Sequence, residues 1–143
     1  MPAHHVYPRR VAYYETDAMG VLHHSNHVRY FEEARVAMIR DKGWMDIHHP
    51  VGPYIFAVTE QSARYYKPAV FDEPLEVWTQ IRRDGGRLAF QYALHSRKSL
   101  AVIAEGFTRL VPIDASFRVA KLPASFLEAV DREPWDDVWP PKC

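Results

Sequence analysis

Cysteine is almost absent from this sequence, since the only one among 143 residues is the last, Cys143. A single cysteine cannot form an intrachain disulfide or a cysteine-based zinc site. A thiol at a chain terminus, where chains usually fray, is also poorly placed to act as a nucleophile. The sequence therefore argues against a disulfide-rich scaffold, a cysteine-ligated zinc protein and a cysteine-dependent enzyme.

An excess of charge of either sign is also missing, because eighteen Lys and Arg residues balance eighteen Asp and Glu residues. Such a chain lacks the long-range positive field that attracts nucleic acids. No apolar run approaches the ~20 residues that cross a bilayer, and the first ten residues lack the apolar core of a signal peptide. We therefore expect a cytoplasmic protein with no nucleic-acid partner and no integral membrane segment.

Internal repeats, low-complexity tracts and Gly/Ser linkers do not occur in the sequence. At 48% hydrophobic and 25% charged residues, the composition is that of a globular domain and not of a disordered chain. Pro134, Pro140 and Pro141 cluster near the end. We expect one domain over residues 1–143, with an irregular tail from about residue 132.

Apolar residues repeat with a helical period in one long segment and with a period of two in most others. Asp84-Gly85-Gly86 is typical of a hairpin turn. The patterns predict, in order, a strand over 6–14, a loop over 15–24, a helix from Ser25 or Asn26 to Gly43, strands over 54–67, 75–83, 87–95 and 100–113, and a short helix over 123–131. Consecutive hairpins indicate a mostly antiparallel sheet, so the expected class is α+β.

The sequence also predicts several side-chain contacts of these elements and how their surfaces are covered. Ser25 or Asn26 can cap the long helix with its side chain, and Glu32 and Arg35 are spaced for an ion pair on it. The sheet face opposite the helix is expected to carry Trp78, Tyr54 or Tyr65, which suggests a covered second surface or a partner. Unpaired edge strands favour a homo-oligomer.

The loop that contains Asp17 leads directly into the N-terminus of the long helix. Backbone N–H groups of residues 24–26 are unpaired at such a terminus, and the helix dipole adds positive charge there. A carboxylate beside donors of this kind is equipped to hydrolyse an acyl derivative, as nucleophile or as base for water. On spacing alone, Asp17 can equally be the cap of a turn, and His24 a surface histidine.

The pattern Tyr13-x3-Asp17-x2-Gly20-x3-His24-x6-Phe31-Glu32-x-Ala34-Arg35 resembles the signature of hotdog-fold acyl-CoA thioesterases. The similarity is greatest to the 4-hydroxybenzoyl-CoA thioesterases and the YbgC-type enzymes, and it extends over roughly residues 6–130. Met19 departs from the pattern, because glycine is frequent at that place.

The resemblance implies an antiparallel sheet wrapped around one long central helix, assembled into dimers and often homotetramers with sites at the subunit interface. It implies an acyl-CoA substrate, with Asp17 as catalytic aspartate, His24 at the helix N-terminus and Tyr13 near the carboxylate. The backbone N–H groups of His24 and Ser25 would polarise the thioester oxygen.

Basic residues could bind the phosphates of CoA, for which Arg82, Arg83, Arg87 and Lys67 are the candidates, although each can also be solvated surface. We expect no metal and no cofactor. His23 and His27 stand four residues apart, yet no third ligand follows at a zinc-protease spacing.

Two other functions remain open on the same fold. One is a non-catalytic acyl-CoA binding module, because a fold does not determine an activity. The other is a hydratase or dehydratase, whose sites resemble a histidine and an acid on the central helix, whereas Asp17 precedes the helix by several residues.

Overall fold

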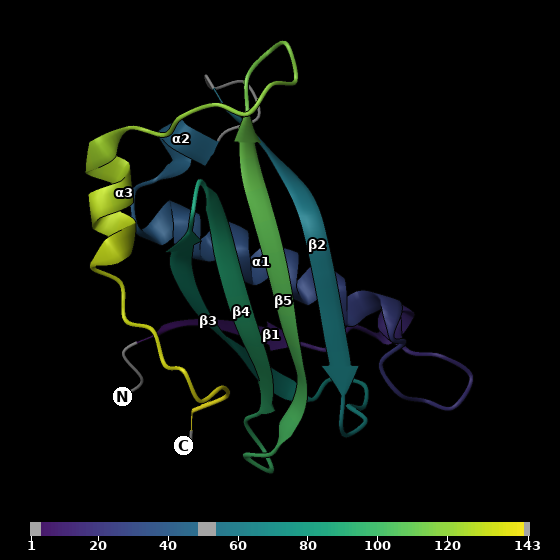
Figure 1. Ribbon diagram of the computed structural model, residues 1–143. Helices are drawn as coiled ribbons and strands as arrows, with labels where there is room; N and C mark the ends of the chain where they lie inside the picture. Colours follow the sequence, from purple (N-terminus) through teal and green to yellow (C-terminus); the bar gives the residue numbers. More distant parts are fainter. Residues whose placement is uncertain (1–3, 49–53, 142–143) are drawn as a thin grey trace.

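A computed structural model describes residues 4–48 and 54–141 of the chain. Five antiparallel strands form one sheet in the order β1-β3-β4-β5-β2 (Figure 1). The strands are β1 (His5–Arg10), β2 (Ile55–Tyr65), β3 (Pro74–Asp84), β4 (Arg87–Ser96) and β5 (Val102–Ile113). The helices are α1 (Ser25–Asp41), α2 (Met45–His48) and α3 (Ala124–Asp131), and a 3₁₀ turn spans Tyr13–Glu15. The expected α+β class and antiparallel sheet are confirmed.

The strand β4 is the middle strand of the sheet, between β3 and β5, and the inward-facing residues of β3 and β4 are mostly apolar side chains at alternate positions. Leu75, Val77 and Ile81 of β3 are fully buried, as are their counterparts on β4. Asp84 pairs with Arg87 at the turn, where Gly85 adopts a positive φ of 62°. The predicted hairpin at Asp84-Gly85-Gly86 is therefore confirmed.

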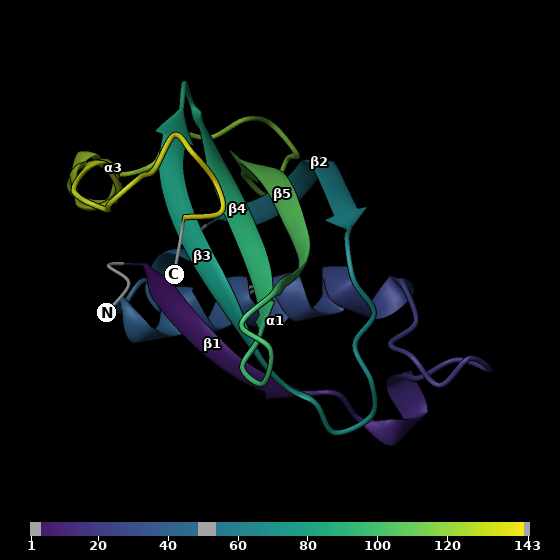
Figure 2. The same cartoon turned by 90° about the horizontal axis from the view of Figure 1, so that it is seen from below.

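Helix α1 runs along one face of the sheet for 17 residues (Figure 2). Its buried side includes Tyr30, Phe31 and Met38, and the Phe31 ring stacks on Tyr92 of β4 with centroids 4.9 Å apart. Gly43 ends the helix at a positive φ of 76°, as predicted. No helix in the described ranges is long and apolar enough to span a membrane.

The strand expected over residues 6–14 is shorter than predicted. It ends at Arg10, and Tyr13–Glu15 form a 3₁₀ turn, because the Glu15 side chain folds back to accept the Ala12 N–H at 2.8 Å. Helix α2 was not predicted. Its four residues continue the chain soon after α1 ends, and a segment of this length is too short to show a period.

Two side-chain pairings on α1 also differ from expectation. The N-cap residue is His24, and no side chain caps the helix, so neither Ser25 nor Asn26 has the predicted role. Glu32 and Arg35 form no ion pair within the described residues. Arg35 instead donates to the hydroxyl of Tyr92 at 3.2 Å, a partner 57 residues away that local spacing cannot reveal.

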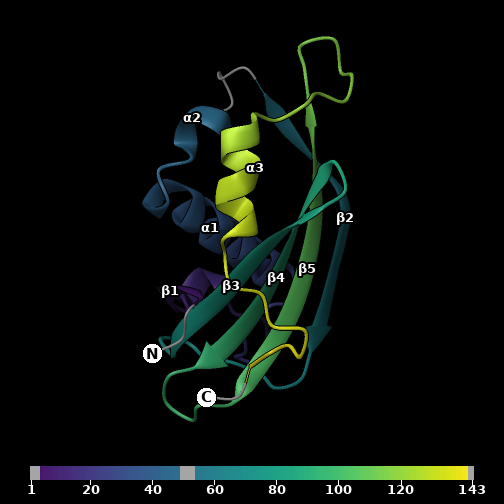
Figure 3. The same ribbon diagram turned by 60° about the vertical axis from the view of Figure 1, so that its left-hand side comes forward.

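The C-terminal tail covers part of the sheet face opposite α1 (Figure 3). Residues 132–141 contain no helix or strand, and residues 142–143 of the expected irregular tail lie outside the described residues. Gln80 of β3 exchanges hydrogen bonds of 2.8 and 3.1 Å with the backbone of Asp136, and Trp139 donates to the Tyr92 carbonyl at 3.1 Å. The tail thus provides part of the predicted cover.

Of the three aromatic residues expected on that face, only Trp78 lies there. Trp78 is buried and packs against His95 with ring centroids 4.3 Å apart. Tyr65 instead meets His27 of α1, and Tyr54 packs against the core. A bulge between Val58 and Glu60 shifts the register of β2, so alternation counted along the strand does not give the face of Tyr65, and Tyr54 precedes the strand.

Glycine at position 106 allows α1 to approach the sheet closely, and its replacement tests this contact. A Cβ at Gly106 would overlap the ring of Phe31. We expect Gly106→Ala to lower the free energy of unfolding by about 1–3 kcal/mol through overpacking, measured by urea denaturation. Gly86→Ala is the control, because no atom lies within 4 Å of a Cβ there. Equal denaturation midpoints for the two variants would contradict this description of the packing.

Candidate active site

Asp17 lies in a tight hairpin that precedes α1. The hairpin closes through a bridge between Thr16 and Leu22 and through the Asp17 N–H, which donates to the Val21 carbonyl at 2.9 Å. Gly20 turns the chain at a positive φ of 77°, a conformation that favours glycine. The loop projects beyond the N-terminal end of α1 (Figure 1).

The two carboxylate oxygens of Asp17 have different surroundings. Oδ1 accepts the N–H groups of Met19 at 2.8 Å and Val21 at 3.4 Å. This oxygen therefore has the turn-capping role that spacing alone suggested. Oδ2 accepts no hydrogen bond from any residue in the described part of the chain, so one oxygen of a partly exposed carboxylate is available for chemistry.

The two backbone N–H groups predicted as donors at the start of α1, those of His24 and Ser25, also have different surroundings. The Ser25 N–H donates to Nδ1 of His23 at 3.2 Å, and the Ser25 hydroxyl lies 2.8 Å from the same atom. The N–H of His24 has no hydrogen-bond partner among residues 4–48 and 54–141. His24 is thus the position at which an N–H is available for a ligand oxygen.

The carbonyl oxygen of Glu15 joins the hairpin to the helix. It accepts the N–H of His23 at 2.9 Å and Nδ2 of Asn26 at 3.0 Å. Asn26 is buried and was predicted only as a possible cap. Its place four residues before the core residue Tyr30, on the same side of α1, is the sequence signal that could have indicated a buried tertiary contact.

A cavity of about 280 Å³ opens beside the first turn of α1. It is lined by Leu22, His24, His27, Tyr65, Tyr66, Lys67 and Pro68. Tyr65 donates to the His24 carbonyl at 3.2 Å, and its ring meets His27 edge-on with centroids 4.7 Å apart. The structure thus brings His24 and Lys67 together, whereas Asp17 does not line the cavity of this single chain.

Tyr13 and the three predicted arginines lie elsewhere. The exposed ring of Tyr13 packs edge-on against Phe71, with centroids 5.5 Å apart. Arg82, Arg83 and Arg87 lie around the β3–β4 turn, away from the N-terminus of α1 (Figure 1). Arg83 pairs with Asp131 of α3 at 2.6 Å, and the guanidinium of Arg82 lies 4.4 Å from the Trp135 ring centroid. Within one chain, none of the three arginines joins His24.

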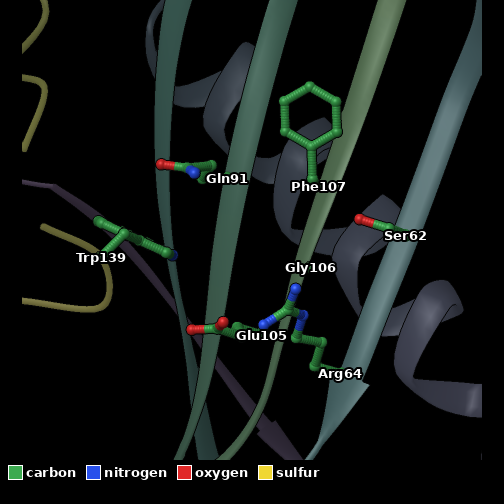
Figure 4. A pocket seen from close by; sticks show the side chains of 7 residues that line it. All are labelled: Ser62, Arg64, Gln91, Glu105, Gly106, Phe107 and Trp139. Atoms are coloured by element: carbon green, nitrogen blue, oxygen red, sulfur yellow. The ribbon is translucent and has the colours of Figure 1, made fainter. Parts of the chain in front are cut away.

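Two further cavities contain none of the predicted site residues. A largely apolar one of about 350 Å³ is lined by α1, Met45, the first residues of β2 and Leu110. A polar one of about 210 Å³ lies across β4, β5 and β2, where Figure 4 shows Gln91, Glu105 and Arg64 around it.

Of the two histidines that line the cavity beside the first turn of α1, His27 is expected to make folding sensitive to acid. Burial lowers the pKa of His27 more than its hydrogen bond to the His24 carbonyl raises it. The folded chain therefore binds this proton more weakly than the unfolded chain, whose histidines titrate at about pH 6.5. We expect the free energy of unfolding to fall as the pH is lowered through that value.

An NMR titration of the imidazole protons should place the midpoint of His27 below pH 6.5. His95 shifts in the same direction through its own burial, so His27→Gln is expected to remove only part of the pH dependence and His95→Gln another part. A His27 midpoint at or above that of an unfolded histidine would show that burial of this imidazole does not cause the acid sensitivity.

Comparisons with known proteins show the family. Residues 11–130 match the family model of the thioesterase-like superfamily. The chain is 36% identical over 75 residues to the acyl-CoA thioester hydrolase YbgC of Escherichia coli, an alignment that covers 52% of this chain and 56% of that protein. A protein from Aquifex aeolicus is 30% identical over 125 residues, which is 87% of this chain and 96% of the relative.

Solved structures show the same arrangement of sheet and helix. The 1,4-dihydroxy-2-naphthoyl-CoA thioesterase Slr0204 from Synechocystis superposes with a TM-score of 0.80 at 22% identity, over 89% of this chain and 95% of that one. Protein TT1821 from Thermus thermophilus has a TM-score of 0.79 at 32% identity, over 90% and 98% of the two chains. The chain therefore belongs to the thioesterase-like superfamily, and its antiparallel sheet and helix match those of hotdog-fold thioesterases.

Proposed function

We propose that this protein is an acyl-CoA thioesterase that hydrolyses its substrate to a free acid and CoA. The proposal rests on two polar groups, one at each end of the segment from Asp17 to His24. Within the described residues, Asp17 Oδ2 accepts no hydrogen bond and the His24 N–H donates none. The names of the Escherichia coli and Synechocystis proteins support an acyl-CoA substrate.

In the proposed reaction, the thioester oxygen accepts the His24 N–H, and negative charge develops on that oxygen beside the positive end of the α1 dipole. Asp17 Oδ2 either attacks the carbonyl carbon or takes a proton from the attacking water. The carbon–sulfur bond then breaks, and the sulfur leaves as the thiolate of CoA. In the nucleophilic route, water next hydrolyses the acyl anhydride on Asp17 and releases the free acid. In the general-base route the free acid forms directly, and the proton held by Asp17 passes to the thiolate or to solvent. The hydrogen bonds from Met19 and Val21 to Oδ1 hold the carboxylate in place.

The remaining predicted site residues have supporting roles in this proposal. Lys67 lines the cavity beside His24 and is placed to attract the anionic part of CoA. Tyr13 positions the substrate near the carboxylate. The predicted phosphate contacts of Arg82, Arg83 and Arg87 require a second copy of the chain, because these residues flank the β3–β4 turn, and that turn lies away from the N-terminus of α1 (Figure 1).

We further propose that two copies pair through β2, forming a dimer that can assemble into a tetramer. Of the two sheet edges, β1 is short and contains Pro8, which blunts pairing. Strand β2 has 11 residues without proline. Apolar side chains lie exposed along it, with Ile55, Val58 and Tyr65 at 42%, 46% and 48% exposure.

A two-fold axis near the middle of β2 would complete the site. Antiparallel pairing of two identical strands sets the end of one, near Tyr65, against the start of the other, near Ile55. The cavity beside His24 in one copy would then adjoin the apolar cavity at the start of β2 in the other. The second cavity offers space for the acyl group.

Asp17→Asn tests the proposed reaction. The substitution keeps the size of the side chain and removes its negative charge, so kcat should fall by at least about 100-fold while KM changes little. Thiol release from a panel of acyl-CoAs is the measurement. Asp114→Asn is the matched control, because Asp114 caps an exposed turn in the same way, accepting the N–H groups of Ser116 and Arg118.

Thiol release separates a thioesterase from the two other functions, and a measurement of acyl unsaturation then separates those two from each other. A hydratase would change acyl unsaturation without releasing thiol, and a binding module would do neither. An Asp17→Asn variant that folds correctly and retains the wild-type kcat would remove Asp17 from the mechanism.

Val58→Lys tests the proposed interface. A lysine in the edge strand should prevent two copies from pairing, so sedimentation velocity should shift from an oligomer toward a monomer, with loss of thiol release. Val138→Lys, at a valine in the tail that is 79% exposed, is the control and should keep the wild-type assembly. A wild-type chain that is monomeric and active at micromolar concentration would contradict the interface.

A further inference from the structure

Glu15 is an acidic residue in the interior of the protein. Its side chain is buried, with 4% of the residue exposed. Oε1 accepts the hydroxyl of Tyr30 at 2.6 Å and the Ala12 N–H at 2.8 Å, and Oε2 accepts Nη2 of Arg9 at 2.8 Å. A buried carboxylate is unfavourable unless it is paired and hydrogen-bonded, and this one has both kinds of compensation.

The surrounding groups stabilise the Glu15 carboxylate as hydrogen-bond donors. The Arg9 guanidinium lies 4.4 Å from the Tyr30 ring centroid and also donates to Glu33 at 2.9 Å. Burial, followed by the hydrogen bond to Glu15, raises the pKa of Tyr30, so its hydroxyl stays protonated as a donor. The three partners come from β1, from the start of the 3₁₀ turn and from the second turn of α1.

The backbone of the same residue holds the hairpin of Asp17. The Glu15 carbonyl accepts the N–H of His23 and Nδ2 of Asn26, and Asp17 follows two residues later. One residue therefore connects the sheet, both strands of the hairpin and the first two turns of α1. We therefore expect displacement of its side chain to shift Asp17 relative to the His24 N–H, even though the Leu22 N–H also anchors the hairpin by donating to the Ala69 carbonyl at 2.8 Å.

We propose that Glu15 is a positioning residue, whose buried carboxylate fixes the distance and angle between Asp17 and the N-terminus of α1. The inference rests on the proposed thioesterase activity, although its structural part can be measured without turnover. Glu15 itself does not contact the substrate and acts through Asp17 alone.

Glu15→Gln is the first variant. The amide keeps the size of the side chain and turns one acceptor into a donor, which must face Arg9, Tyr30 or the Ala12 N–H. A small displacement at a reacting group costs up to about 100-fold in rate, so we expect kcat to fall about 10- to 100-fold with little change in KM.

Glu33→Gln is the matched control. Glu33 accepts Arg9 and the hydroxyl of Tyr7, so its replacement disturbs the same arginine without touching the hairpin, and kcat should stay near that of the wild type. A similar loss in both variants would overturn the proposal, because the effect would then belong to the ion-pair network as a whole.

A double-mutant cycle with Asp17→Asn distinguishes positioning from a general structural role. If Glu15 acts through Asp17, Glu15→Gln should lower kcat in the wild-type background and cause little further loss in the Asp17→Asn background. Equal losses in both backgrounds would show that Glu15 supports the fold and does not position Asp17.

Amide hydrogen exchange gives a readout that needs no substrate. Exchange of residues 16–23 should accelerate in Glu15→Gln and remain unchanged in Glu33→Gln, and no acceleration would overturn the inference. If Glu15→Gln does not fold, Tyr30→Phe removes a single donor and should give the same changes at smaller size. A wild-type chain that releases no thiol would defeat the proposed function, while the exchange comparison would still decide the positioning.

Discussion

The carbonyl oxygen of Glu15 is the point on which the candidate site depends. It accepts one hydrogen bond from the hairpin of Asp17 and one from the first turn of α1. This junction links the hairpin directly to the helix, while the Leu22 N–H, which donates to the Ala69 carbonyl at 2.8 Å, ties the hairpin to the segment before β3. The sheet contributes to the site indirectly, because the buried side chains of Tyr30 and Phe31 pack α1 against its inner face.

The proposed mechanism gives Asp17 two roles, one structural and one chemical. Its Oδ1 stabilises the hairpin by accepting the Met19 and Val21 N–H groups, whereas Oδ2 is the oxygen to which we assign chemistry. The turn-capping interpretation and the catalytic one are therefore compatible, because they concern different atoms of one side chain. The capping bonds supply the preorganisation that a nucleophile or base requires.

Sequence patterns predicted the regular elements well and the side-chain partners poorly. Alternation over β3 and β4, the turn at Asp84-Gly85-Gly86 and the end of α1 at Gly43 are local features, and the structure confirms each. Arg35 contacts Tyr92 and not the neighbouring Glu32, since the choice depends on a strand far away in the sequence. The motif indicated Asp17 and His24, but the contacts of Glu15, on which its proposed role rests, form only when β1, the hairpin and α1 are assembled.

The proposed thioesterase activity requires a thioester carbonyl to bind between Asp17 and the N-terminus of α1. The most direct test is a crystal structure of Asp17→Asn with an acyl-CoA bound. We predict that the thioester oxygen lies within hydrogen-bond distance of the His24 N–H, with its carbon next to residue 17. A thioester bound elsewhere, such as in the cavity between Arg64 and Gln91 on the opposite face of the sheet, would contradict the claim.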